Sequence, residues 1–319
     1  MKSGKTTAAA AGIAFAILAG SCFTGIENTG RITDSDVRRR HASDITPEQT
    51  FLSAIASEPP SAWRNGKPFR VTDKRFSILL TPASASATDI AGRDILFAGF
   101  RPYSSITGTK ILEATFTDSK QPADTFFYRT PMLVSAMDKA KELVIPFTVD
   151  LDLVARADSA LTGRTLYIIS PMWLDPADSM KACEGFRHIE VRVDTVIAGT
   201  DVYPLAVVFD VTDPRLAITS PRAIYMTLGN SRTATRNFET IFSFTNPRKR
   251  YPQVSDDVWE LIIRSRVRKD MTRDECRLAL GAPSQIERFP TSSGMAERWR
   301  YTDGVYLVFD DGYLVNFRL

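Results

Sequence analysis

The fold of the C-terminal part is decided by the stretch Met271-Thr272-Arg273-Asp274-Glu275-Cys276-Arg277-Leu278-Ala279-Leu280-Gly281-Ala282-Pro283. Thr272 followed by Glu275 is a capping box, in which the two side chains satisfy free backbone N–H groups at a helix start. Gly281 permits the left-handed conformation that ends a helix, and Pro283 bars its continuation. The stretch therefore predicts a helix of about eight residues.

The sequence on either side completes a small α+β unit. Upstream, Val258, Leu261 and Ile262 fall on one face of a helix that begins at Asp256 and Asp257, where the helix dipole favours acidic residues. Downstream come four strand-like runs, Ile286–Phe289, Glu297–Tyr301, Val305–Phe309 and Tyr313–Phe317, with turns at Pro290–Gly294, Asp303-Gly304 and Asp310-Asp311-Gly312. Two helices followed by an antiparallel meander predict a sheet with one face covered.

Residues 254–319 resemble the SmpA/OmlA family of bacterial lipoproteins. The resemblance rests on the spacing of Thr272, Glu275, Leu280, Gly281 and Pro283, the aromatic strand at Trp299, and the run Asp311–Phe317. It implies a fold like that of β-lactamase inhibitor protein. The family includes a small subunit of the outer-membrane β-barrel assembly machinery, so the resemblance implies a role in outer-membrane assembly or maintenance.

Residues 67–245 show the strand-and-turn pattern of an antiparallel β domain. Predicted strands include Phe69–Val71, Phe76–Leu80, Ile95–Phe97, Ile111–Phe116, Phe126–Tyr128, Leu143–Val149, Thr165–Ile169, His188–Val193 and Leu205–Phe209. The run Ile90–Phe97 is echoed by Leu161–Ile168, and Ile106–Thr109 is echoed by Ile197–Thr200. Either the echo is a coincidence, or residues 67–130 and 145–228 are duplicated modules with a cleft between them for a ligand.

The N-terminus has the pattern of an export signal. Lys2 and Lys5 precede an apolar run from Ala8 to Leu18, which ends in the small residues Ala19-Gly20-Ser21. The run is shorter than the roughly 20 residues of a membrane span. Residues 1–21 are therefore predicted to be a signal peptide.

Cys22 follows the small residues directly, and Leu18–Cys22 resembles the lipobox of bacterial lipoproteins. The resemblance implies cleavage before Cys22 and acylation of its thiol, which would anchor the chain in a membrane through buried acyl chains. The alternative is ordinary cleavage with an unmodified cysteine nearby. Phe23-Thr24 lacks an inner-membrane retention residue, which favours the outer membrane.

Residues 22–45 are mostly polar and are predicted to be a lipidated tether. They contain the basic cluster Arg38–Arg40, which we interpret as a solvated group rather than a site for head groups or an acidic partner. Residues 46–66 are predicted to hold a short helix, capped by Thr46 with Pro47 in its first turn and running to about Ser57, and a linker.

The composition predicts a folded protein with a packed core. The 319-residue chain is 44% hydrophobic with a net charge of +3, and loss of Lys2 and Lys5 with the signal leaves +1, which gives no reason to expect nucleic-acid binding. Cys183 and Cys276 either pair across two domains or remain separate buried thiols, which we favour.

Residues capable of catalysis are sparse. His188 has no neighbouring metal-ligand motif and no Gly-x-Ser-x-Gly nucleophile motif accompanies it. Asp150 and Asp152 would share a strand face, a pairing that glycosidases use, although carboxylates at a loop edge are commoner. Asp310-Asp311-Gly312 lacks the further ligands of a calcium loop and is expected to be a turn. The aromatic residues Trp63, Trp173, Phe186, Tyr203, Trp299, Tyr301, Tyr306 and Tyr313 are expected to lie mostly in the core, with some at a partner surface.

These features predict a mainly β protein with an α+β C-terminal unit, without cofactor or metal. We expect a lipid-anchored cell-envelope scaffold or adaptor, non-enzymatic and bound to another envelope protein. The alternative is a surface-exposed lipoprotein that binds a glycan or peptide. A hydrolase with an unfamiliar site built on His188 is a third hypothesis.

Overall fold

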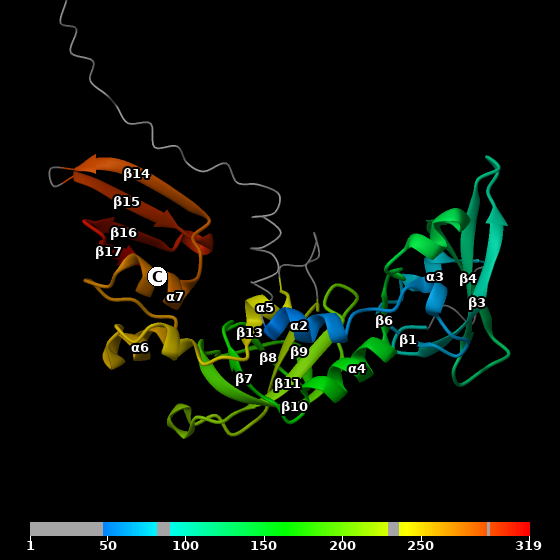
Figure 1. The fold of residues 1–319 in the computed structure, drawn as a ribbon, viewed down its shortest axis with the longest axis horizontal. Coiled ribbons are helices and arrows are strands. Elements are labelled where there is room, and N and C mark those ends of the chain that lie inside the picture. The colour runs from blue at the N-terminus through cyan, green and yellow to red at the C-terminus, as the bar shows by residue number, and fades with distance from the viewer. Residues whose placement is uncertain (1–46, 82–89, 229–235, 292–293) are drawn as a thin grey trace, which may run out of the picture. The chain divides into compact units, whose positions relative to one another are not determined.

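The computed structural model describes residues 47–81, 90–228, 236–291 and 294–319. Within these residues the chain is mainly β with a few helices, and its strands form three antiparallel sheets (Figure 1). The predicted signal peptide, Cys22, the tether and the cap at Thr46 lie outside the described residues. No described helix has the length and apolar character needed to cross a membrane.

The helices of the described residues are short. The α-helices are α2 (Pro47–Ala54), α3 (Phe76–Leu79), α4 (Leu151–Leu161), α5 (Phe238–Ile241), α6 (Asp256–Ile263) and α7 (Arg273–Leu280). The 3₁₀ turns are η1 (Pro60–Ala62), η3 (Val134–Lys139), η4 (Pro214–Leu216), η5 (Pro247–Arg250) and η6 (Thr302–Gly304). Helix α2 begins where predicted and ends three residues before the expected Ser57.

The first sheet has its own aromatic core. Its strand order is β2 (Leu80–Thr81), β5 (Thr125–Leu133), β4 (Lys110–Asp118), β3 (Asp94–Ser104), β1 (Pro68–Val71) and β6 (Thr148–Asp150). Alternate residues of β3, β4 and β5 point inward, and Phe116 meets the rings of Phe69, Phe76 and Phe97 at 5.7, 6.5 and 6.0 Å. This core contains buried residues from Phe69 to Ile145 only.

Two predicted strands of this region are wrong in part. The apolar run Phe76–Leu80 forms helix α3 and then enters β2, because so short an apolar run fits a buried helical turn as well as a strand. The run Leu143–Val149 is a strand only from Thr148, since Ile145 packs into the core from a loop.

The second sheet is joined to the first through the β6–α4 connection. Its order is β13 (Phe242–Ser243), β7 (Thr165–Ile168), β10 (Ile189–Ala198), β11 (Leu205–Val211), β12 (Arg222–Met226), β8 (Trp173–Asp175) and β9 (Asp178–Cys183). Helix α4 packs on β10, burying Leu153, Val154, Ala157 and Leu161. At the β13 edge of this sheet, Glu48 of α2 accepts a hydrogen bond from the N–H of Phe244 at 3.0 Å.

The C-terminal unit follows the predicted order of two helices and four strands. Strands β14 (Gln285–Thr291), β15 (Gly294–Arg300), β16 (Tyr306–Asp310) and β17 (Tyr313–Arg318) form a meander. The capping box of Thr272 and Glu275 is present. Gly281 has the expected positive φ of 85°, but its ψ of −167° lies outside the left-handed helical region that we predicted.

The second sheet and the C-terminal unit share one hydrophobic core. Trp259, Ile262 and Trp299 belong to the same buried cluster as Val191 and Phe209. On α6 the buried residues are Val258, Trp259, Ile262 and Ile263, so Leu261 is displaced from the predicted face to its margin.

The proposed duplication stays a prediction. Gly92 and Gly163, which occupy equivalent positions in the echo, both adopt a φ of 78° in turns that precede β3 and β7. The second pair differs, since Gly108 has a positive φ of 78°, whereas at Gly199 the Tyr203 carbonyl leaves no room for a side chain. The β-lactamase-inhibitor-protein-like fold also stays a prediction.

Candidate functional site

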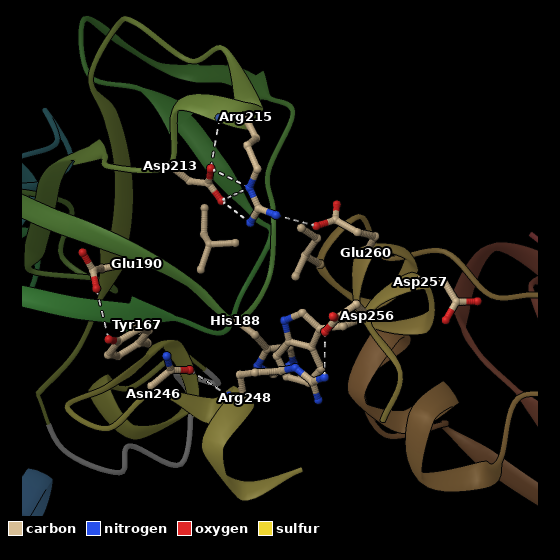
Figure 2. A pocket seen from close by; sticks show the side chains of 13 residues that line it. Tyr167, His188, Glu190, Asp213, Arg215, Asn246, Arg248, Asp256, Asp257 and Glu260 are labelled. Carbon is tan, nitrogen blue, oxygen red and sulfur yellow. Dashed lines mark hydrogen bonds and ion pairs between the residues drawn. The ribbon is translucent and has the colours of Figure 1, made fainter. Parts of the chain in front are cut away.

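A groove lies where the second sheet meets α6 (Figure 2). It has a volume of about 570 Å³. Its side chains come from β7 and β10, from the η4 and η5 turns, and from α6. The lining residues are Tyr167, His188, Ile189, Glu190, Asp213, Arg215, Asn246, Arg248, Asp256, Asp257, Trp259, Glu260 and Ile263.

Arginines hold the two walls of this groove together. Arg215 of η4 pairs with Asp213 at 2.7 Å and reaches Glu260 of α6 at 3.1 Å. The hydrogen bond from Arg215 lowers the pKa of Asp213. On the other side Arg248 pairs with Asp256 at 3.0 Å and stacks over Trp259 at 5.0 Å. The groove is therefore charged, with an aromatic floor and donors and acceptors fixed in place.

His188 lies at the base of the groove in a left-handed conformation with φ of 56°. Its Nε2 is 3.1 Å from the Leu278 carbonyl of α7, and its ring lies 5.7 Å from that of Trp259. Burial lowers the pKa of His188, although the Leu278 carbonyl acts in the opposite direction. Its Nδ1 is buried without a hydrogen-bond partner among the described residues. The ring is thus a neutral link between the second sheet and the C-terminal unit.

A buried ion cluster lies at the junction of the first sheet and α4. The Nζ of Lys67 is 2.9 Å from Asp150, 3.2 Å from Glu58 and 3.3 Å from Asp152, and the lysine side chain is 0% exposed. The rings of Trp63 and Phe69 flank the ammonium group at 5.8 and 5.7 Å.

The charges of this cluster are balanced at its edge. Arg156 of α4 pairs with Glu58 at 3.0 Å, and the more exposed Arg64 pairs with Asp152 at 3.4 Å. Asp150 also caps α4, accepting hydrogen bonds from the N–H groups of Asp152 and Leu153. Asp150 and Asp152 therefore start a helix and do not share a strand face, which corrects the sequence interpretation.

A second cavity, of about 560 Å³, is lined by residues of both predicted modules. Its apolar lining includes Trp63, Phe69, Leu153 of α4 and Val202. The lining also includes the exposed side chain of Val144 and the carboxylates of Glu142 and Asp201. The cavity thus combines apolar and acidic side chains.

The cysteines, the Asp310–Gly312 segment and most of the aromatic residues singled out in the sequence lie outside these sites or in the core. Cys183 and Cys276 are free thiols, Cys183 only half-buried, and burial raises the pKa of Cys276 to about 12. Asp311 and Gly312 have positive φ angles of 45° and 88° and form the two-residue turn between β16 and β17, as expected. Trp173, Phe186 and Trp299 are buried, Tyr301 and Tyr306 are half-buried, and Tyr313 is 52% exposed.

Sequence reasoning missed Lys67, Arg215 and Arg248. Lys67 and Arg215 have acidic partners that are distant in the sequence or in an unpredicted turn, and Arg248 belongs to the basic run Arg248–Arg250, whose 3₁₀ turn was not predicted. Within the described residues no group of three or more His, Cys, Asp or Glu side chains is placed to hold a metal ion. Comparison with family models, curated proteins and solved structures finds no match to the chain.

Proposed function

We propose that the chain is a lipid-anchored protein of the cell envelope, in the outer membrane, that acts as a non-enzymatic scaffold or adaptor in membrane assembly or maintenance. The observation that carries the proposal is Cys22, which directly follows the predicted signal peptide and begins the predicted polar tether. Acylation there would hold the folded part at the membrane surface. The resemblance of residues 254–319 to SmpA/OmlA lipoproteins supports the same location.

The groove of Figure 2 supports binding of a protein partner. It combines arginines, carboxylates and Trp259, and tryptophan and arginine contribute strongly to protein interfaces. The Asp256 side chain is 100% exposed at its edge, and that of Glu260 is 43% exposed. A partner that bridges the groove would contact both the second sheet and α6.

Photo-crosslinking in intact envelopes tests the adaptor role. A photoreactive amino acid at Asp256 and, separately, at Glu260 is expected to give adducts with one and the same envelope protein. The control position is Ile78, whose side chain is 79% exposed and which does not line the groove. Equal adducts from all three positions, or none from the groove, would contradict the proposal.

The cavity lined by both predicted modules favours a second candidate function, ligand binding. Its apolar walls and the carboxylates of Glu142 and Asp201 suit a peptide in which basic and apolar residues alternate. A synthetic Lys-Leu repeat peptide is expected to raise the melting temperature of the protein, and Val202→Lys, which places a like charge in the cavity, is expected to abolish that shift. The matched control is Val315→Lys on β17, which is also exposed. Equal shifts in the wild type and Val202→Lys would exclude this cavity.

A further inference from the structure

Three strands of the first sheet place two arginines around one carboxylate. In the β3–β4–β5 register, Arg101 lies opposite Glu113, which in turn lies opposite Arg129. The Nε of Arg101 donates to Oε1 of Glu113 at 2.5 Å, and the Nε of Arg129 donates to Oε2 at 3.2 Å. Glu113 is only 1% exposed, so the guanidinium groups cover it.

Aromatic rings fix both guanidinium groups. Arg101 lies over the ring of Phe127 at 4.2 Å, and Arg129 lies over the ring of Tyr103 at 3.9 Å. The side chains nevertheless remain 56% and 39% exposed. Stacking and the shared carboxylate restrict the arginine rotamers in the free protein, which reduces the entropy lost when a ligand binds.

Within the described part of the chain, the outward donors of this pair have no acceptor. Both contacts to Glu113 use Nε, and no described residue accepts a hydrogen bond from the terminal nitrogens of either arginine. A guanidinium group with these nitrogens free fits the two oxygens of a carboxylate. Two arginines and one glutamate leave the group with excess positive charge.

The neighbouring side chains indicate a protein as the source of the carboxylate. Ile111 pairs with Leu133 on the same face of the sheet, and Leu133 is 45% exposed. Ile106, in the turn between β3 and β4, is fully exposed. Arginine and tyrosine beside exposed aliphatic residues are typical of protein interfaces.

We propose that Arg101 and Arg129 form a carboxylate clamp that docks an acidic segment of a partner protein on this face of the first sheet. The inference specifies that the partner of the proposed adaptor presents acidic side chains. It rests on the proposed function only in assuming that the partner is a protein. Its test uses a defined peptide, so it can fail while anchoring and groove crosslinking succeed, and the reverse.

The test is direct binding of a fluorescein-labelled Glu-Leu repeat peptide to the mature protein in neutral-detergent micelles at low salt. Fluorescence anisotropy should show binding that the matching Gln-Leu peptide lacks. The double variant Arg101→Lys, Arg129→Lys keeps the charge but loses the planar fork, and should bind at least about tenfold more weakly. Arg70→Lys is the matched control, since Arg70 pairs with Asp94 in the same sheet and is similarly exposed. It should bind like the wild type.

Glu113→Gln separates docking from a purely structural role. The substitution removes the internal acceptor and raises the net charge of the clamp by one, so the acidic peptide should bind more tightly. If the contacts among Arg101, Glu113 and Arg129 are purely structural, all variants should instead show lower melting temperatures and unchanged peptide affinity. That result would overturn the proposal. Displacement of the peptide by inorganic phosphate or anionic vesicles as readily as by unlabelled peptide would overturn the assignment to a protein segment.

Discussion

The described chain has two junctions, one between the first sheet and α4 and one between the second sheet and the C-terminal unit. Each contains a buried basic side chain, but the surroundings of the two side chains differ. At the first sheet, the buried amino group of Lys67 is surrounded by the carboxylates of Glu58, Asp150 and Asp152. At the C-terminal unit, burial lowers the pKa of His188, which favours its neutral form. Ionic groups thus connect the first sheet to α4, whereas the second sheet and the C-terminal unit share a continuous apolar core in addition to the Arg215–Glu260 ion pair.

Arg187 sharpens this contrast. It is adjacent to His188, and its guanidinium donates to the Ser265 hydroxyl at 3.1 Å and the Ile169 carbonyl at 3.3 Å, both neutral acceptors. Burial lowers the pKa of Arg187. The second junction should therefore depend on packing and pH, and the first on keeping its charges paired.

Lys67→Met should have the largest effect. It leaves three carboxylates around an apolar side chain, and loss of one partner of a buried ion pair costs about 3–5 kcal/mol of unfolding free energy. Urea unfolding measures the change, with Lys74→Met as the control because Lys74 is exposed. A loss no larger than that of the control would mean that the cluster does not stabilise the first junction.

Trp259→Ala should come next and affect the second junction. Trp259 is 9% exposed, contacts the His188 ring and belongs to the shared core. We expect a loss of about 3 kcal/mol, at the lower end for a buried tryptophan because its edge reaches the groove. Ile286→Ala, at a site that is 45% exposed, serves as the control in the same unfolding experiment. Similar losses in both variants would argue against a shared core at this junction.

Thr272→Ala should have a smaller effect, about 1 kcal/mol. The side chain accepts a hydrogen bond from the Glu275 N–H at 3.3 Å at the start of α7, the helix whose Leu278 carbonyl meets His188. Hydrogen exchange of the α7 amides should become faster, while Thr302→Ala, outside any α-helix, should leave it unchanged. Unchanged exchange in Thr272→Ala would show that the cap does not hold this end of the junction.

His188→Gln should change mainly the pH dependence of stability. Because burial lowers the folded pKa, the unfolded chain takes up a proton first, at its ordinary pKa of about 6.5. The contribution of the neutral ring is complete above that pH and is lost as the pH falls toward the folded pKa. Urea unfolding from pH 7.5 to 5 should show a shallower decline in the variant. Equal slopes would mean that His188 is not buried as a neutral ring.

The C-terminal unit was the more predictable region because each of its signals is local. Thr272 and Glu275 lie three residues apart, and Asp311-Gly312 forms a turn by itself. In the first sheet, by contrast, the apolar run Phe76–Leu80 fits a buried helix as well as a strand. Its conformation depends on packing against distant strands, where Phe76 contacts Phe116 and Tyr128.

The candidate sites were less predictable than the fold. Lys67 and Asp152 are separated by 85 residues, and Arg215 and Glu260 by 45. No short pattern relates such residues, since their encounter depends on strand order. Helix α4 was missed for a related reason: we considered a strand face or a loop edge for Asp150 and Asp152, whereas Asp150 is a helix cap.

Anchoring at Cys22 is decided by intact mass and membrane fractionation of the wild type beside Cys22→Ala, with Cys183→Ala as the control cysteine. We predict acyl mass on the N-terminal cysteine of the wild type and Cys183→Ala, recovery of both in outer-membrane fractions, and loss of membrane association in Cys22→Ala. A wild-type protein that is cleaved, carries no lipid and fractionates as a soluble protein would contradict the lipid anchor and the adaptor role built on it.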